Sequence, residues 1–302
     1  MTGKIERRVN DPNRVVRKVM LSPVVIILLL VTLFPFVFTI ALTFSKVNLA
    51  GGFHISWNGL YYWGKLLGDA RFWNSVARTY LIVGCSVSLE YVIGFALALA
   101  LWQRMRLRDS FQVLFLAPMA LTPIGIGYAW RMLFHETKGP LNDLLSHIGV
   151  APVNWLTNAG TAVIPIIAVD VWQWTPFMLL ILFAALQSFP DSLVEAARMD
   201  GASPWRLFSG IIFPVLWPSS VAAIFIRVIE CFKILDVIVI MTGGGPGIST
   251  ESATLYAYTV GLKSFDLAYG ATVAMGFFLF IAVTVGVLMG LANRLVGSRY
   301  AA

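Results

Sequence analysis

Charged side chains are scarce in this sequence. Only 12% of its 302 residues are Asp, Glu, Lys or Arg, whereas 58% are hydrophobic. An ordinary soluble domain has about a quarter of its residues charged. So few charges cannot cover a water-exposed surface, and most of the outer surface must therefore face lipid.

Cysteine and histidine are also rare, and the motifs of nucleotide hydrolysis are missing. Two cysteines, Cys85 and Cys231, both lie in apolar runs and accompany three histidines, so we expect no disulfide framework and no metal site. No G-x-x-x-x-G-K-[ST] loop occurs, and the glycine run Gly243–Gly247 lacks the lysine that would have to follow it. No nucleophile–base pair stands out. We therefore expect no catalytic residues, no cofactor and no enzymatic activity in this chain.

Six apolar runs are each long enough to cross a bilayer. They are Val24–Phe44, Val76–Leu101, Phe111–Leu133, Ala162–Leu186, Ile211–Ile240 and Ala268–Leu291. The first run is too long for the core of a signal peptide and has no cleavage site, so it predicts an uncleaved span. The sequence thus predicts an all-α polytopic membrane protein with six transmembrane helices and no soluble domain.

The basic residues predict the orientation of these helices. Thirteen fall on one side: Lys4, Arg7, Arg8, Arg14, Arg17, Lys18, Arg104, Arg106, Arg108, Arg198, Arg206, Arg294 and Arg299. Seven fall on the other: Lys46, Lys65, Arg71, Arg78, Arg131, Lys138 and Lys263. The side richer in Lys and Arg faces the cytoplasm, which places both termini there. Because the net charge of +7 gathers at span ends, topology explains it and no nucleic-acid partner is expected.

A charged, small-residue-rich segment, "EAARMDGASPWRLFSGIIFP", separates the fourth and fifth runs on the cytoplasmic side. Ser192 is predicted to cap a short helix, which Gly201 ends. A second short helix is predicted to begin at Pro204, after Ser203. A helix–turn–helix outside the bilayer suits the groove of a partner protein. The alternative is a solvated loop at the membrane interface.

This segment resembles the EAA signature of ABC importer permeases. The pattern is Glu195-Ala196-Ala197, then Asp200-Gly201-Ala202, with Ile211 nine residues further on and Pro214 three residues after that. In that family the segment is the coupling helix that docks into the ATPase subunit. The resemblance implies that Glu195 pairs with a basic residue of the ATPase and that Asp200 stabilises the turn. It implies close approach at the small residues Ala196, Ala197 and Gly201.

Other stretches are similar to the carbohydrate branch of the family, the maltose-type permeases. They are "DARFWNSVARTY", "VWQWTPFMLLILFAALQSFP", "KILDVIVIMTGGGPG" and "ESATLYAYTVGLKSFDLAYGAT", and the resemblance covers roughly residues 60 to 290. It implies the fold of a type I ABC importer permease, with a cytoplasmic tail at 1–20 and a permease domain at 21–300 that includes the coupling segment 190–214. It also implies the bacterial inner membrane as the location. The implied partners are a second homologous permease, two ATPase subunits, a solute-binding protein that is periplasmic or lipid-anchored, and membrane lipid.

Ionisable residues inside spans are candidates for function, because the membrane penalises unpaired charge. Arg227, Glu230, Lys233 and Asp236 recur every three residues in the fifth run, a spacing at which neighbours on a helix can pair. They form a structural ladder, a wall of a substrate cavity, or both, with Arg227 and Glu230 structural and Lys233 and Asp236 nearer the pocket. Glu90 in the second run is interpreted as a polar helix-packing contact.

The fourth run carries groups that suit a sugar. Carboxylates and amides bond hydroxyl groups, and aromatic faces stack on pyranose rings, although such clusters also serve packing. The resemblance implies a pocket with Asp170, Gln173, Trp174 and Phe177 on one wall and Phe232, Lys233 and Asp236 on another. Asp170 and Lys233 stand where the maltose permease has neutral groups. Maltose is therefore not the expected ligand, and a polar or anionic sugar derivative is favoured.

The sequence thus predicts the permease subunit of a binding-protein-dependent ABC importer for a carbohydrate, polyol or sugar derivative, with ATP hydrolysed by partner subunits. The alternative is a secondary sugar transporter driven by an ion gradient, for which the expected inverted repeats are not found. A membrane-embedded enzyme or sensor would need a reactive cluster or a soluble output domain, and neither is seen.

Overall fold

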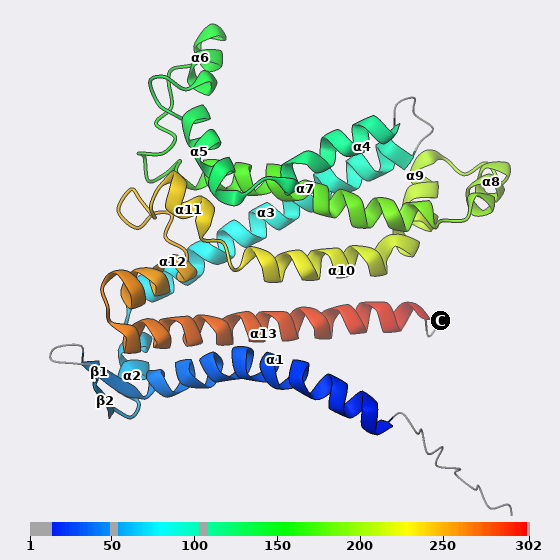
Figure 1. Ribbon diagram of the computed structural model, residues 1–302. Coiled ribbons are helices and arrows are strands. Elements are labelled where there is room, and N and C mark those ends of the chain that lie inside the picture. Colours follow the sequence, from blue (N-terminus) through cyan, green and yellow to red (C-terminus); the bar gives the residue numbers. More distant parts are fainter. Residues whose placement is uncertain (1–13, 49–53, 103–107, 301–302) are drawn as a thin grey trace, which may run out of the picture.

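The computed structural model describes residues 14–48, 54–102 and 108–300, and this part of the chain is a bundle of long helices (Figure 1). The predicted basic residues Lys4, Arg7, Arg8, Arg104 and Arg106 lie outside the described residues, as do the first thirteen positions of the predicted tail. The side chains of Arg14, Arg17, Lys18, Arg108 and Arg299 are likewise outside the description.

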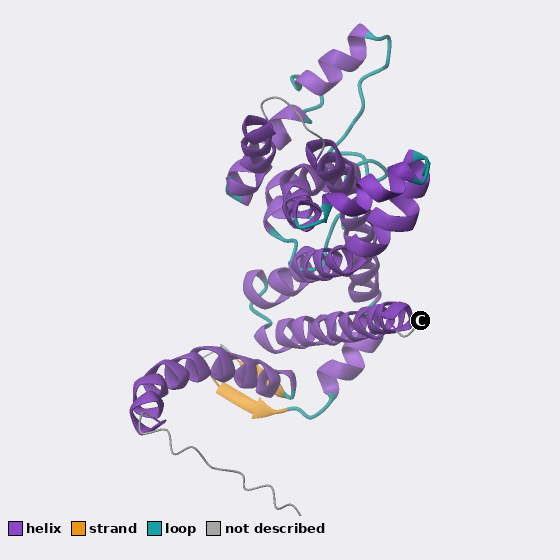
Figure 2. Cartoon of the chain, turned by 90° about the vertical axis from the view of Figure 1, so that its right-hand side faces the viewer, coloured by secondary structure: helices purple, strands orange, loops and turns teal. Residues whose placement is uncertain are grey.

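The N-terminal half begins with one long helix and a small hairpin, followed by helices that run back and forth. The elements are α1 (Arg14–Thr43), β1 (Ser45–Asn48), β2 (His54–Trp57), α2 (Tyr61–Leu67), α3 (Ala70–Trp102), α4 (Arg108–Leu116), the 3-10 turn η1 (Ala117–Ala120), α5 (Pro123–Leu133) and α6 (Pro140–His147). The strands β1 and β2 pair antiparallel, with Ser45 opposite Trp57. Figure 2 shows this hairpin beside the end of α1.

The C-terminal half alternates long helices with short ones. Its elements are α7 (Val163–Gln187), α8 (Asp191–Met199), α9 (Pro204–Leu207), the π turn η2 (Phe208–Ile212), α10 (Phe213–Cys231), α11 (Asp236–Met241), α12 (Ala253–Tyr258), the π turn η3 (Thr259–Lys263) and α13 (Leu267–Tyr300). Helix α1 lies along α13 and contacts little else, which leaves its apolar side chains open to lipid.

Five helices of the described chain are long and apolar enough to span a membrane, and a bent pair brings the number to six. The prediction of six spans is therefore confirmed, but two of the predicted helices are not continuous. The third is bent by 97° between Ser110–Ala120 and Pro123–Leu133. Pro123 disfavours helical backbone at the residue before it, and Thr122 is accordingly extended, with φ −71° and ψ 136°. The predicted fifth span, Ile211–Ile240, is broken after Cys231.

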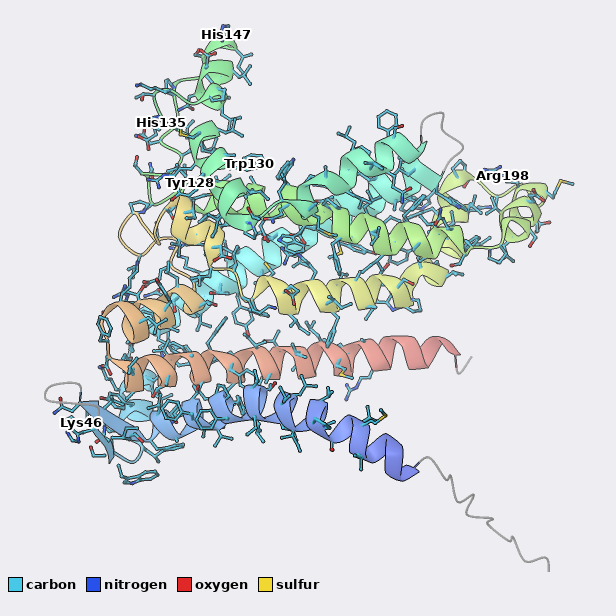
Figure 3. The ribbon with its side chains drawn as sticks, viewed as in Figure 1. Lys46, Tyr128, Trp130, His135, His147 and Arg198 are labelled. Carbon is cyan, nitrogen blue, oxygen red and sulfur yellow. The ribbon has the colours of Figure 1, made fainter. Side chains whose placement is uncertain are left out.

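The two ends of the bundle differ in what they carry. The α8–α9 turn, the start of α1 and the end of α13 lie at one end, and α2, α12 and the hairpin lie at the other (Figure 1). Figure 3 marks the same ends with Arg198 and Lys46, and it shows His135 and His147 on the arm that extends through α5 and α6.

The centre of the bundle is the contact between α3 and α7. Gly94 lies at their closest approach, where an added Cβ would stand 2.6 Å from the Cβ of Met178. Only glycine permits this distance, because any side chain would force the two helices apart. Ile82, Leu182 and Phe72 are almost fully buried at other points along these two helices, so α3 and α7 form the support for the remaining helices.

A polar network ties the start of α3 to α12 and α13. The carboxylate of Asp69 accepts hydrogen bonds of 2.5 Å from the hydroxyls of both Tyr256 and Tyr269. Arg71 donates to both carboxylate oxygens of Glu251, at 2.7 and 2.8 Å. These contacts join segments about 180 to 200 residues apart in the chain, and they close the bundle at the end that carries the hairpin.

We predict that Asp69→Asn loosens this end of the bundle. Burial alone would raise the pKa of Asp69, but the hydrogen bonds from Tyr256 and Tyr269 lower it below its ordinary value. A lowered carboxyl pKa stabilises the fold above about pH 4 and ceases to do so as the pH falls through the folded-state pKa. At pH 7 the variant should lose about 1 kcal/mol, measured as a lower unfolding midpoint of the purified protein.

The matched control is Asp143→Asn, which removes an exposed carboxylate on α6. The control should unfold like wild type at all pH values. The difference between Asp69→Asn and wild type should shrink as the pH falls below about 4. Equal midpoints at pH 7 would contradict the role assigned to Asp69.

Candidate functional site

The fifth span stops part-way across the bundle and resumes in another direction. Helix α10 ends at Cys231, and Leu235 leaves helical backbone with φ −139° and ψ −57° before α11 begins. Asp236 is the first residue of α11, where a carboxylate favours the start of a helix. The sequence around the break is rich in β-branched residues, which weakens the helix there.

Hydroxyl groups from another element satisfy the carbonyls that the break releases. Thr254 donates to the carbonyl of Phe232 at 3.2 Å, and Ser252 donates to that of Ile234 at 3.0 Å. Both donors come from the start of α12. A buried carbonyl without a partner would destabilise the fold, so α12 stabilises the break directly.

A buried ion cluster lies one turn before the break. The guanidinium of Arg227, on α10, contacts Glu90 of α3 at 2.7 and 2.9 Å. It also donates to Oδ2 of Asp170, on α7, at 2.7 Å. The thiol of Cys231 lies 3.3 Å from the same oxygen, and Trp174 faces the guanidinium at 5.0 Å. One cation thus holds three helices together through two carboxylates.

A polar cavity of about 160 Å³ opens between this cluster and the break. Its lining comes from α7, α10, the break itself, α11 and the start of α5: Pro123, Asp170, Gln173, Trp174, Arg227, Glu230, Cys231, Lys233, Ile234, Leu235, Asp236 and Val237. Small-molecule sites usually exceed about 300 Å³, so this cavity can hold one part of a ligand.

Five of the seven side chains predicted for a substrate pocket line this cavity. They are Asp170, Gln173, Trp174, Lys233 and Asp236. The other two, Phe177 and Phe232, belong instead to the hydrophobic cluster between α3, α10 and α13. Phe232 is 1% exposed and packs against the rings of Tyr80 and Phe277, so it supports the cavity from behind.

The ladder predicted on the fifth span is only half present. Lys233 pairs with Glu230 at 2.8 Å, and both are exposed. Arg227 turns away from Glu230 and binds carboxylates on two other helices. The helix ends before Lys233, so the regular three-residue spacing does not continue along one face. From the sequence, Glu90 was interpreted only as a packing contact. The structure shows that it is a buried ion-pair partner of Arg227.

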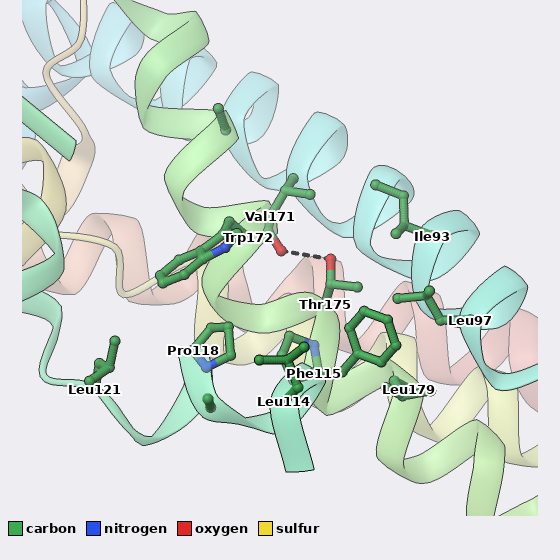
Figure 4. A pocket seen from close by; sticks show the side chains of 13 residues that line it. Ile93, Leu97, Leu114, Phe115, Pro118, Leu121, Val171, Trp172, Thr175 and Leu179 are labelled. Atoms are coloured by element: carbon green, nitrogen blue, oxygen red, sulfur yellow. Dashed lines mark hydrogen bonds between the residues drawn. The ribbon is translucent and has the colours of Figure 1, made fainter. Parts of the chain in front are cut away.

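A larger groove lies elsewhere and is almost entirely apolar. It measures about 680 Å³ and runs between α3, α4, η1 and α7 (Figure 4). The hydroxyl of Thr175 lies there, but it donates to the carbonyl of Val171 at 2.6 Å. The exposed indole of Trp172 flanks the groove. This mostly apolar surface offers few hydrogen-bonding groups to a sugar, so we assign the candidate site to the smaller polar cavity.

The predicted helix–turn–helix is present as α8 and α9 at one end of the bundle. Val194 and Ala197 are buried against the core, whereas Glu195, Met199 and Trp205 are exposed. The segment therefore has a packed inner face and an outer face with both charge and apolar surface. Such a mixed outer face is suited to contact with another protein.

Only one of the two N-terminal caps predicted for these helices is present in the structure. Ser203 caps α9, because its hydroxyl accepts a hydrogen bond from the backbone N–H of Arg206 at 3.4 Å. The cap predicted at Ser192 is wrong: Pro190, with φ −67° and ψ 120°, takes that position, and α8 begins at Asp191, two residues earlier than predicted. Gly201 has φ +74°, a left-handed conformation that glycine adopts without strain.

Within residues 14–48, 54–102 and 108–300, no three His, Cys, Asp or Glu side chains are arranged to hold a metal ion.

Taken together, the fold and the site define a helical membrane protein with a polar cavity at a broken span. The model of the family described as "Binding-protein-dependent transport system inner membrane component" matches residues 90–300. The chain belongs to this family of inner membrane transport components. Membership places it with binding-protein-dependent systems rather than with the ion-gradient-driven transporters considered as the alternative.

Several relatives have been named. The chain is 36% identical to the trehalose/maltose transport system permease protein MalF of Thermococcus litoralis, over 73% of this chain and 79% of that one. It is 30% identical to the trehalose transport system permease protein SugA of Mycobacterium tuberculosis, over 87% and 84% of the two chains. It is also 30% identical to the sulfoquinovosyl glycerol transport system permease protein SmoG of Agrobacterium fabrum, over 88% and 86%.

A solved structure shares the fold. A chain of a bacterial ABC transporter that imports the acidic polysaccharide alginate superimposes with a TM-score of 0.78, over 92% of this chain and 95% of that one. The two sequences are 20% identical, so this match supports the architecture and says nothing of the ligand.

We predict that Arg227→Gln destabilises the protein severely. The substitution leaves Glu90 and Asp170 buried without a cation, and breaking a buried pair costs about 3–5 kcal/mol. The triple variant Glu90→Gln, Asp170→Asn, Arg227→Gln removes all three charges together and should recover part of the loss. Unfolding midpoints of the purified variants measure both effects. If Arg227→Gln alone is as stable as wild type, the ion cluster does not hold the three helices together.

Proposed function

We propose that the chain is one of two permease subunits of an ABC importer that carries a carbohydrate, polyol or sugar derivative into the cell. Family membership supports transport, and the named trehalose and maltose relatives support the class of ligand. The observation that carries the ligand class is the polar cavity at the broken span.

The chemistry of that cavity suits sugar hydroxyls. Asp170 and Gln173 offer oxygen acceptors, and Lys233 offers donors. The indole of Trp174 offers a flat face for the apolar side of a pyranose ring. We assign substrate contact to these residues and to Asp236, with Phe177 and Phe232 packed behind them.

The exposed face of α8 and α9 is the proposed docking site for an ATPase subunit. Glu195 offers charge to a basic partner, and Ala196 is exposed and small enough for close contact. Asp200 and Gly201 form the turn, and Ala197 anchors the segment to the core. A movement of the partner would therefore pass to the packed ends of α3, α7 and α10.

The remaining assignments follow from this docking. In the proposed complex the α8–α9 end faces the cytoplasm, both termini lie on that side, and the helices occupy the bacterial inner membrane. The complex contains a second permease, two ATPase subunits that hydrolyse ATP, and a solute-binding protein on the outer side. The chain is a permease domain at 21–300, preceded by a tail at 1–20.

Uptake by the native host tests this function. Deletion of the gene should abolish uptake of at least one labelled sugar in a panel of mono- and disaccharides that includes trehalose and maltose. Arsenate, which depletes ATP, should stop this uptake sooner than an uncoupler does. Unchanged uptake of every carbohydrate in the panel, or loss that follows the uncoupler alone, would contradict the proposal.

We predict that Gly201→Val abolishes uptake while the protein stays in the membrane. The position needs φ +74°, which a β-branched residue adopts only with strain. The matched control is Gly201→Asn, because asparagine tolerates this conformation and no atom lies within 4 Å of the added Cβ. The control should keep most of the uptake, measured at equal membrane abundance.

Glu195→Lys should abolish uptake as well, since it reverses the charge offered to the partner. Glu195→Gln keeps the shape and should retain partial activity. Normal uptake by both Gly201→Val and Glu195→Lys would remove the docking role from this segment.

A further inference from the structure

The side chains around the polar cavity carry more negative than positive charge. Asp170, Glu230 and Asp236 line it together with the cations Arg227 and Lys233. The carboxyl group of Glu90 lies directly behind, outside the lining, and shares the guanidinium of Arg227 with Asp170. The three lining carboxylates against two lining cations leave a net charge of −1.

The excess charge can be assigned to particular groups. Glu230 and Lys233 neutralise each other at 2.8 Å. Arg227 neutralises the lining carboxylate of Asp170. Asp236 supplies the excess negative charge, because its side chain forms no hydrogen bond or ion pair among the described residues.

Two buried acceptors point to the kind of ligand that enters. Asp170 is 4% exposed, and its Oδ2 accepts from Arg227 at 2.7 Å. Gln173 is 2% exposed, and its amide nitrogen donates to the carbonyl of Leu121 at 3.4 Å. Its Oε1 has no donor among the described residues. A buried acceptor without a donor favours a ligand that supplies one.

We propose that this cavity takes an uncharged, hydroxyl-bearing part of the ligand and rejects anionic groups. Hydroxyls donate to the carboxylate of Asp170 and to Oε1 of Gln173, whereas a carboxylate or sulfonate supplies no proton and meets the excess negative charge. This selection rests on the proposed function and narrows it. It also opposes the anionic sugar derivative that the charges favoured in the sequence. Arg227 and Glu90 act as positioning residues, because they fix the carboxylate of Asp170.

Two cysteine positions allow the sign of the charge to be measured without the ligand. Cys231 lines the cavity and Leu235 is a half-buried, uncharged lining residue. Cys85 is exposed and is removed by Cys85→Ala. The full-length Cys85→Ala protein is prepared with and without Leu235→Cys, in open membrane fragments. Each protein is treated with a methanethiosulfonate that carries either a trimethylammonium or a sulfonate group.

The rate at which each reagent modifies the cysteine is divided by the rate at which the same reagent reacts with free 2-mercaptoethanol. We expect the cationic reagent to react at least about tenfold faster than the anionic one by this measure, at Cys231 or at the introduced cysteine. A ratio near one, or below one, overturns the proposal. Failure of both reagents at both thiols also overturns it, because a cavity closed to small solutes cannot take a ligand.

Charge-neutral variants separate the contributions. Asp236→Asn removes an exposed carboxylate and should lower the ratio several-fold, and Asp170→Asn should lower it as well. Asp143→Asn, on α6 and outside the cavity, should leave the ratio at the wild-type value. If Asp236→Asn leaves the ratio of the cationic to the anionic rate unchanged, the charge does not come from this cavity.

A transport measurement complements the thiol chemistry. In cells that take up a neutral sugar through this chain, its uronate analogue should compete at least tenfold more weakly, and Asp236→Asn should reduce that preference. The thiol ratio needs neither ligand nor partner subunits. If the chain proves not to carry carbohydrate, the proposed function fails but the thiol ratio can still be measured. If the chain does carry sugar and the ratio is near one, only the proposed charge selection fails.

Discussion

The burial of one guanidinium determines how the central helices meet. Arg227 is 2% exposed in the middle of an apolar bundle, where an unpaired charge would be prohibitively unfavourable. Its fork of donors requires acceptors from different directions, and Glu90 and Asp170 supply them from α3 and α7. The register of three helices is thus fixed together, since sliding any one of them would separate a charge from its partner. The close contact at Gly94 allows the two carboxylates to approach the same cation.

The two ends of the bundle are built on this centre in different ways. At one end, hydrogen bonds to Asp69 close the helices against each other through side chains far apart in sequence. At the other, α8 packs through Val194 and Ala197 onto the ends of the long helices and leaves Met199 and Trp205 outside. An apolar side chain that is exposed on a firmly anchored helix loses little conformational entropy when a partner covers it. The anchoring therefore matters as much as the exposed residues.

The sequence was sufficient for features that depend on neighbours along the chain. Long apolar runs predicted the spans, and the start of α9 at Pro204 with Ser203 as its cap follows from local chemistry. The bend of the third span and the break of the fifth were not predicted, because apolar composition continues through both. The pairing of Arg227 was not predicted for a related reason. Regular spacing suggested Glu230 as its partner, whereas the observed partners lie 137 and 57 residues away.

The break in the fifth span and the polar cavity are two aspects of one constraint. Backbone that leaves the helix inside a membrane must be covered by protein or line a cavity, because lipid offers no hydrogen bonds. Here hydroxyls from α12 cover the released carbonyls of Phe232 and Ile234 on one side. On the other side the chain turns past Asp170 and Gln173, so the irregular backbone lies among polar side chains. A continuous helix would carry Asp236 one turn beyond Lys233 on a lipid-spanning segment. The break places it instead at the start of α11 and at the edge of the cavity, where its charge can act on a ligand.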